Sequence, residues 1–291
     1  MVNPRLDRLI LSSNSARISG LKVRTAYNHD HYLLGELMKN ISLIILFLAV
    51  CVIGNADLKD PALAIYYSFD DIKGTIIKDG STSGNDGEIV GNAKFEKGQN
   101  GQAIELKESV WIKINGAEFK NLPKDGFSLV TWVNHEDSGE PQSLFDAIGD
   151  KHGNGLFHVE IRPAGFRFFH RNDAEQEVFN INPGPVIKGK KWHHFAGTYD
   201  AKSRTVATYV DGKKTHEAKA AKGVLATNWK VTAGIGHHKN GRWYKGLLDE
   251  FFLFGKAVTP QEIKEIMDGD FLAVKPLGKL PIAWGAIKSN Q

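Results

Sequence analysis

A short loop near residue 240 carries the side chains best suited to holding a sugar. Arg242, Trp243 and Tyr244 follow one another there, and His238 lies just before them. Aromatic rings stack on the apolar C–H faces of sugars, and polar groups beside them select hydroxyls. The sequence therefore predicts a ligand-binding loop built from His238, Arg242, Trp243 and Tyr244. The alternative is that Trp243 only covers the rim of a β-sheet.

Two pairs of adjacent histidines, His193–His194 and His237–His238, raise the question of metal binding. Successive side chains of a strand point to opposite faces, so neither pair can easily chelate one ion within a strand. No H-E-x-x-H and no His/Cys spacing typical of zinc occurs. We therefore expect one histidine of the 193–194 pair to be buried in the core or at a sheet face.

Nucleophile and nucleotide motifs are also missing from the sequence. It contains no G-x-S-x-G, no G-x-x-x-x-G-K-[ST] and no G-x-G-x-x-G that follows a strand. The single cysteine, Cys51, lies in an apolar run near the N-terminus. The chain has 291 residues, 42% of them apolar, and a net charge of +4. This is ordinary globular composition, and the charge is too weak to favour a nucleic-acid partner.

The apolar run at residues 41–53 predicts export. It is shorter than the roughly 20 residues of a membrane span, and it has the length of a signal-peptide core. We assign residues 38–56 to a signal peptide cleaved after Ala56. Residues 1–37 are then a non-native or disordered extension, or alternatively a cytoplasmic tail. Lipidation of Cys51 is a second alternative, disfavoured because Val50 stands where a small residue is expected.

Without this leader the chain is nearly neutral and rich in predicted strands. Removing residues 1–56 leaves 31 basic and 30 acidic residues. Short β-prone runs alternate with turn signals at 84–87 and 211–212. One short helix is predicted from a capping box at 259–262, with Pro at the first helical position and Gly269 at the end. The expected strands are residues 62–69, 103–106, 110–114, 127–134, 143–148, 156–161, 166–170, 178–181, 192–199, 206–210, 214–218, 231–235 and 247–254.

Several motifs, taken in order, resemble one family. They are YYSFD at 66–70, DGSTSGNDG at 79–87, GQNGQAIEL at 98–106, FSLVTWV at 127–133, KWHHFAGTYD at 191–200, YVDGK at 209–213, GLLDEFFLF at 246–254 and TPQEI at 259–263. Together they resemble a concanavalin A-like jelly roll of the laminin-G-like type. The resemblance implies an all-β fold of two antiparallel sheets packed face to face, with one short C-terminal helix. We expect the domain to span residues 57–270, followed by an extended tail at 271–291.

The resemblance also implies a structural calcium ion. Asp70, Asn85 and Asp249 stand where its oxygen ligands are expected, with Asp79 and Glu250 as substitutes. Calcium favours carboxylate, amide and carbonyl oxygens. The alternative is that Asp70 and Asp249 only cap turns or pair with lysines.

Glycoside hydrolases share this jelly roll and supply the enzymatic alternative. They need two carboxylates flanking the scissile bond, and the related enzymes place them on one strand as E-x-D-x-E. That signature is absent, Glu160 and Asp146 lie on different predicted strands, and Asp249 and Glu250 are expected to point to opposite faces. The sequence therefore favours an exported, non-catalytic binding or adhesion module for carbohydrate or an extracellular protein. A hydrolase or lyase with a non-standard acid pair and a structural cell-envelope domain are the alternatives.

Overall fold

The structure is a computed structural model that describes residues 60–148, 155–182, 184, 186–221, 225–226, 232–239 and 241–272. The chain divides into two units, Met1–Asn55 and Ala56–Gln291, and everything described here belongs to the second. The predicted signal peptide, the extension before it and Cys51 lie outside the described residues. No helix within the described ranges is long and apolar enough to cross a membrane.

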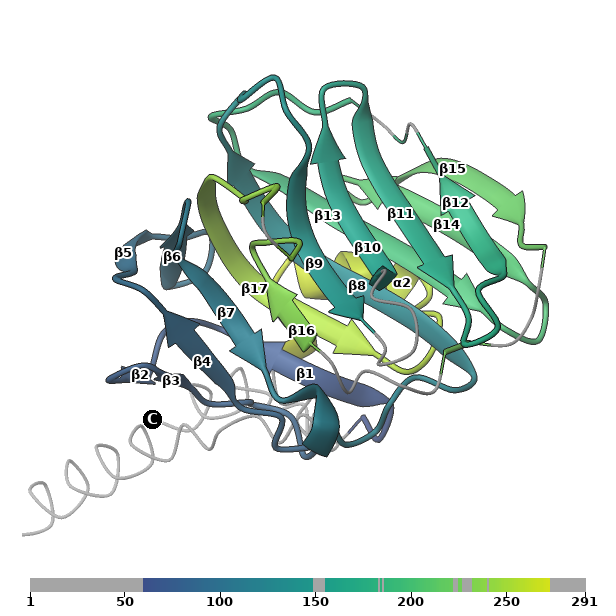
Figure 1. Ribbon diagram of the computed structural model, residues 1–291, viewed down its shortest axis with the longest axis horizontal. Coiled ribbons are helices and arrows are strands. Elements are labelled where there is room, and N and C mark those ends of the chain that lie inside the picture. The colour runs from purple at the N-terminus through teal and green to yellow at the C-terminus, as the bar shows by residue number, and fades with distance from the viewer. Residues whose placement is uncertain are drawn as a thin grey trace, which may run out of the picture. The chain divides into compact units, whose positions relative to one another are not determined.

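Two antiparallel sheets form a sandwich (Figure 1). The eight-stranded sheet has the order β15-β14-β13-β8-β17-β6-β5, and β1 also pairs with β17. Its strands are β1 (Leu63–Tyr67), β5 (Lys94–Lys97), β6 (Gln102–Leu106), β8 (Gly126–His135), β13 (His193–Asp200), β14 (Thr205–Val210), β15 (Lys213–Lys219) and β17 (Gly246–Phe254). Strands that pair in this sheet can be far apart in the sequence, as β8 and β17 are. Pairing between distant segments therefore defines the jelly roll.

The second sheet has nine strands in the order β12-β11-β10-β9-β16-β7-β4-β3-β2. They are β2 (Ile72–Lys73), β3 (Ile76–Ile77), β4 (Gly87–Val90), β7 (Trp111–Ile114), β9 (Gln142–Ile148), β10 (Gly155–Arg162), β11 (Gly165–Arg171), β12 (Glu177–Ile181) and β16 (Thr232–Ile235). Figure 1 shows this sheet in front of the eight-stranded one. All of its pairings are antiparallel.

The main core lies between the sheets because alternate side chains of each strand point inward. In β10 the buried apolar residues are Phe157, Val159 and Ile161. Phe127 of β8 stacks on Phe157 across the sandwich with a centroid separation of 4.3 Å. Burying each such side chain contributes about 1.5–3 kcal/mol, so this layer supplies most of the driving force for folding.

Helix α2 (Pro260–Met267) covers the outer face of the eight-stranded sheet. The predicted capping box is present, because the Thr259 hydroxyl accepts from the Glu262 amide and the Glu262 carboxylate accepts from the Thr259 amide. Ile263 and Ile266 point from the helix into a second apolar cluster, where they join Val130, Ala196, Ala207, Tyr209, Phe252 and Phe254. This is why β8 and β17 are buried on both faces.

The predicted fold class, two antiparallel sheets packed as a sandwich with one short C-terminal helix, is confirmed, with two corrections of detail. Strands β2, β3, β4 and β5 were not predicted, because each has only two to four residues and β5 is largely charged. The predicted extended tail does not begin extended. Its first two residues belong to the 3-10 helix η2 (Asp270–Leu272), and Phe271 packs edge-on against Phe252 and Phe254. The rest of the predicted tail lies outside the described residues. A second 3-10 helix, η1 (Gly116–Glu118), precedes β8.

Candidate functional site

The outer face of the nine-stranded sheet carries a group of buried and half-buried polar side chains. Asp146 of β9 pairs with His158 of β10, and Glu160 follows two residues later on the same face. Asp146, His158 and Glu160 are 3%, 5% and 0% exposed. Buried ionisable groups cost stability unless they are paired, so such a concentration on one sheet face marks a candidate site.

Glu160 lies at the centre of an arginine cluster. Arg162 donates to its Oε2 from Nε at 3.0 Å and from Nη2 at 2.7 Å, and Arg242 donates to Oε1. Arg167 lies 3.5 Å from Oε2. Burial alone raises the pKa of Glu160, but the Arg242 hydrogen bond and the nearby cationic groups outweigh burial and hold that pKa below its usual value. Glu160 is therefore a fixed anion that positions three guanidinium groups.

Asp146 connects two histidines. His238 approaches Asp146 Oδ2 through Nδ1 at 2.9 Å, and His158 Nε2 lies 3.3 Å from Oδ1. The two imidazole centroids are 4.4 Å apart. Burial lowers the pKa of His158 to about 4 despite the neighbouring Asp146 carboxylate, so His158 is neutral at physiological pH.

An aromatic stack lies beside this cluster. Trp111 of β7 covers Gly234 of β16, where a Cβ would stand 2.9 Å from the indole ring. His237 meets Trp111 edge-on at a centroid distance of 3.9 Å, and Trp243 stacks on His237 at 5.4 Å. Gly234 is the direct cross-strand neighbour of Asp146, so the aromatic stack and the polar cluster adjoin.

The loop between β16 and β17 is held in a narrow turn. His238 and Gly241 exchange two backbone hydrogen bonds of 3.0 and 2.9 Å, and Lys239 and Arg242 have φ values of 46° and 51°. Non-glycine residues seldom adopt this left-handed conformation, and they do so where the surroundings hold them. The turn thereby places His238 over Asp146 and Arg242 over Glu160.

Three of the four predicted ligand-binding residues are together at this face, and the fourth is not. Tyr244 was predicted to contact a ligand, but it is fully buried in the core and its hydroxyl donates to the Leu247 carbonyl at 2.7 Å. Trp243 stacks on His237 at the outer face, whereas the next residue, Tyr244, turns into the core.

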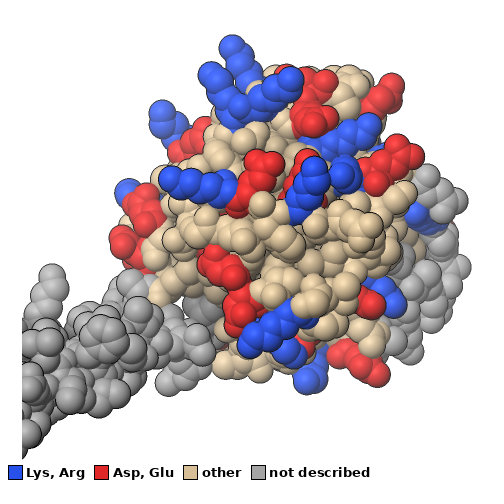
Figure 2. All heavy atoms as spheres, turned by 90° about the vertical axis from the view of Figure 1, so that its left-hand side faces the viewer, with Lys and Arg blue, Asp and Glu red and all other residues tan. Residues whose placement is uncertain are grey.

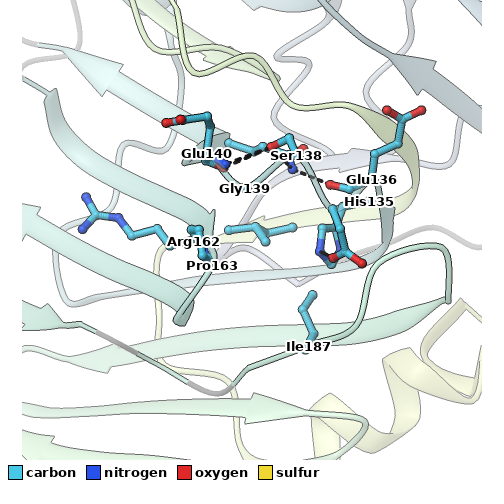
Figure 3. A pocket seen from close by; sticks show the side chains of 11 residues that line it. His135, Glu136, Ser138, Gly139, Glu140, Arg162, Pro163 and Ile187 are labelled. Atoms are coloured by element: carbon cyan, nitrogen blue, oxygen red, sulfur yellow. Dashed lines mark hydrogen bonds and ion pairs between the residues drawn. The ribbon is translucent and has the colours of Figure 1, made fainter.

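A small pocket of about 210 Å³ adjoins the arginine cluster. The hairpin loop between β8 and β9 and the turn after Arg162 form its walls. Figure 3 shows the Arg162 and His135 side chains on opposite sides of this pocket. Pockets for drug-sized ligands occupy about 300–1,000 Å³, so this one suits a single small ring or group.

The predicted calcium ligands do not form one group. Asp70 and Asp249 both reach the loop between β5 and β6, where Asp249 Oδ2 accepts from the amides of Gln99 and Asn100 and Asp70 Oδ1 accepts from Gln102. Asn85 is engaged elsewhere. Its side-chain amide donates to the carbonyls of Ala64 and Lys120 and accepts from the Lys120 backbone amide. Because these backbone groups occupy the side chain, the prediction of Asn85 as a calcium ligand is wrong.

Two glycines make room for these carboxylates. A Cβ at Gly98 would lie 2.3 Å from Asp249 Oδ2, and one at Gly101, where φ is +69°, would lie 2.1 Å from Asp70 Oδ1. The G-x-x-G spacing of the sequence therefore has a physical reason, because both positions must lack a side chain. Asp79, a predicted substitute ligand, instead accepts hydrogen bonds from the amides of Tyr66, Ser81 and Asn85.

The prediction that Glu250 and Asp249 point to opposite faces is wrong. It has a φ of 49° within a bulge of β17, and the bulge turns its carboxylate towards Tyr66 and Asn100. Burial raises the pKa of Asp249 to about 6. Burial and the Asp249 charge raise the pKa of Glu250 to about 8. Both carboxylates therefore meet at one rim of the sandwich, and their negative charges repel.

The structure also shows what the search for an acid pair and for a metal motif missed. Asp146 and Glu160 share one face of adjacent strands, and His158 lies between them. No sequence spacing signals this group, because pairing of β9 with β10 and the return of the chain at His238 assemble it. Only the alternation of β10, with polar His158, Glu160 and Arg162 between Phe157, Val159 and Ile161, indicated an outward polar row.

Comparisons with known proteins agree with the fold. A sequence profile of the laminin-G type, described as the concanavalin A-like lectin/glucanases superfamily, matches residues 107–264, more than half of the chain. No curated protein matches the chain.

Solved structures with the same fold include domain 4 of an extracellular arabinanase of Geobacillus stearothermophilus in complex with arabinotriose. It has 19% identity and a TM-score of 0.53, over 70% of this chain and 97% of that domain. The binding domain of botulinum neurotoxin DC in complex with SialylT has 14% identity and a TM-score of 0.56, over 73% and 52% of the two chains. The binding domain of Paraclostridial mosquitocidal protein 1 has 14% identity and a TM-score of 0.58, over 73% and 53%. The chain spans about half the length of these toxin domains.

Proposed function

The chain belongs to the concanavalin A-like lectin/glucanases superfamily, and from this premise we propose that it is a non-catalytic carbohydrate-binding module. Its binding face is the outer surface of the nine-stranded sheet around Trp111, Trp243 and Arg242. Export through the predicted signal peptide would bring this face to extracellular glycans. Structures of the same fold bound to arabinotriose and to SialylT support this choice of ligand class.

One observation carries the proposal: the aromatic stack and the arginine cluster adjoin on the outer face of the nine-stranded sheet. The stack of Trp111, His237 and Trp243 offers an apolar ring surface. Arg242, whose side chain is 41% exposed, offers guanidinium donors beside that surface. A ring that stacks and a fixed donor that selects hydroxyl or carboxyl groups are the two elements of sugar recognition.

The charges of the cluster favour sugars with acidic groups over neutral ones. Arg162, Arg167 and Arg242 share a single carboxylate, Glu160. Guanidinium groups bind carboxylates with paired hydrogen bonds, so a uronate or sialate could pair with the donors that Glu160 leaves unused. By contrast, the face shown in Figure 2 has basic and acidic side chains interspersed over it.

The electrostatics of Glu160 argue against an acid catalyst at this face. A glycosidase needs one carboxylic acid with a raised pKa that can protonate the leaving group. Glu160 has the opposite property, because arginines hold its pKa below the usual value. We therefore propose that Glu160 organises donors and transfers no proton.

We further propose that calcium binds at the rim and stabilises the fold. Asp70, Asp249 and Glu250 provide an all-oxygen donor set around the β5–β6 loop, which is the chemistry that Ca²⁺ prefers. An ion there would offset the repulsion between these carboxylates. It would hold the loop and the bulge of β17, and it is not part of the proposed sugar contact.

The test is a titration of the full chain with a panel of neutral and acidic oligosaccharides, followed by calorimetry. We expect saturable binding to at least one oligosaccharide, with acidic members bound more tightly. Arg242→Ala should weaken that binding, whereas Lys213→Ala, an exposed residue on β15 of the other sheet, should leave it unchanged. Failure of every oligosaccharide to bind, or release of reducing ends from them, would overturn the proposal.

A further inference from the structure

Three metal-ligating side chains from separate parts of the chain converge beside the arginine cluster. Asp146 comes from β9, His158 from β10 and His238 from the loop after β16. One donor atom from each of them lies within 4.8 Å of the others. Sheet pairing sets the first two side by side, and the narrow turn at 238–241 brings the third over them.

We propose that Asp146, His158 and His238 bind a divalent transition-metal ion, with Zn²⁺ as the best match. This inference does not rest on the proposed carbohydrate binding, because it concerns a different set of atoms and is measured without sugar. It is also separate from the proposed calcium ion, whose ligands belong to the rim of the other sheet.

Unsatisfied atoms in the cluster point to a missing partner. Asp146 Oδ1 and His158 Nδ1 are buried and make no hydrogen bond in the described part of the chain. Asp146 and His158 are 3% and 5% exposed, so solvent does not readily supply what is lacking. Buried polar atoms are nearly always paired, and a cation between the carboxylate and the imidazoles would satisfy Asp146 Oδ1.

The donor set selects the class of metal. Two imidazole nitrogens and one carboxylate oxygen suit zinc and its neighbours, whereas calcium and magnesium prefer oxygen alone. Ligands bound tetrahedrally at about 2.0–2.1 Å from zinc stand about 3.3 Å from one another. His158 Nε2 lies 3.3 Å from Asp146 Oδ1, and His238 Nδ1 lies 2.9 Å from Asp146 Oδ2, so each imidazole already faces one oxygen of the same carboxylate. One donor atom from each residue lies within 4.8 Å of the others, so small side-chain movements would bring the three to ligand spacing.

The surroundings also match those of a metal-bound histidine. Such a histidine usually directs its second ring nitrogen at a carboxylate, which fixes the ring and strengthens the ligand. His158 Nδ1 faces Glu160 Oε1 at 3.9 Å, which is longer than a hydrogen bond, and the three arginines hold Glu160 in place. Three protein ligands leave a position for water or another oxygen ligand.

Zinc binding by the full chain, without an affinity tag and after removal of metals with EDTA, tests this inference. Calorimetry with ZnCl₂ should give one tight site per chain, and zinc should raise the melting temperature. Cobalt in place of zinc should give the visible absorption of a low-coordinate Co²⁺ site, which adventitious surface binding would not produce. Calcium at the same concentration should not displace zinc.

Two ligand variants and one control make the result specific. His238→Ala, at a partly exposed position, and Asp146→Asn, which keeps the side-chain shape, should each weaken zinc binding by more than tenfold. His216→Ala, an exposed histidine on β15 of the other sheet, should leave zinc binding unchanged. Circular dichroism establishes that each variant is folded. An absence of tight zinc binding, or equal zinc affinity in His238→Ala, Asp146→Asn and the unaltered chain, would overturn the proposal.

Discussion

The outer faces of the two sheets carry opposite kinds of side chain. On the eight-stranded sheet, Val130, Phe252 and Phe254 point outward and are buried beneath helix α2. On the nine-stranded sheet, the corresponding outward positions of β9 and β10 hold Asp146, His158 and Glu160. One face therefore continues the core, and the other concentrates charge and aromatic rings.

The difference indicates how stability and recognition are divided. Covering the first face with α2 removes apolar area from water and stabilises the fold. Burying ionisable groups on the second face contributes little to stability, because desolvation offsets the attraction between charges. Substitutions should therefore separate into two classes, one that changes the free energy of unfolding and one that changes ligand affinity.

The largest expected effect is on the covered face. Phe252→Ala removes a ring that stacks on Tyr66 at 4.5 Å and contacts Phe271, and the cavity should cost about 3–5 kcal/mol of stability. Urea unfolding of the variant measures this loss. Oligosaccharide affinity of the folded fraction should not change. A parallel loss of that affinity would show that the two faces are coupled.

The covered face should also make the protein acid-sensitive. His194 is fully buried there, edge-on to Trp132, with the Asp211 and Asp268 carboxylates near it, and burial lowers its pKa to about 4. The unfolded chain takes up a proton near pH 6.5 but the folded chain does not. The contribution of His194 to stability is thus fully present above pH 6.5 and declines by about 3 kcal/mol as the pH falls to 4.

His194→Phe checks this assignment. Neither ring nitrogen of His194 has a hydrogen-bond partner among the described residues, so the replacement removes no hydrogen bond. Unfolding free energies measured from pH 7.5 to 4 should fall less steeply in the variant than in the unaltered chain. Identical slopes would assign the acid sensitivity to other groups.

Calcium bound at the rim beside Asp249 is expected to stabilise the fold without contributing to sugar binding. Calcium at about 100 times its Kd should stabilise the fold by about 2.7 kcal/mol, seen as a shift of the melting temperature relative to EDTA. Asp249→Asn should abolish the shift, whereas Asp79→Asn should retain it. Equal melting in calcium and EDTA would contradict the calcium proposal and leave the sugar proposal untouched.

The smallest energetic effect is expected on the open face. Trp243→Ala removes the outer ring of the aromatic stack, and oligosaccharide affinity should fall about tenfold, or about 1.4 kcal/mol, with little loss of stability. Calorimetry measures the affinity, and the exposed Lys213→Ala variant is the matched control. Loss of stability without loss of affinity would make Trp243 a cover for the sheet rim.

The fold was predictable from sequence because its signals are local. The alternation of β10, the turn at 211–212 and the capping box at 259–262 each lie within a few residues. Strands β2 to β5 escaped prediction because they are too short or too charged to show a period. Glu250 was misplaced because a bulge cannot be seen in a strand of apolar residues.

The candidate site was only half predictable. Its loop was recognisable because Arg242 and Trp243 are adjacent, whereas the inward direction of Tyr244 depends on which face Trp243 takes. Asn85 was assigned by motif position, and its amide proved to be used by backbone groups. Asp146, His158 and His238 meet only through strand register, which no spacing in the sequence encodes.

The position of a bound sugar tests the central claim most directly. A crystal structure of the chain with the oligosaccharide that binds most tightly would locate it. We predict a sugar ring against Trp243 and a hydroxyl or carboxyl group within hydrogen-bond distance of Arg242, on the outer face of the nine-stranded sheet. A sugar bound at the rim beside Asp249, or on the eight-stranded sheet, would contradict the account.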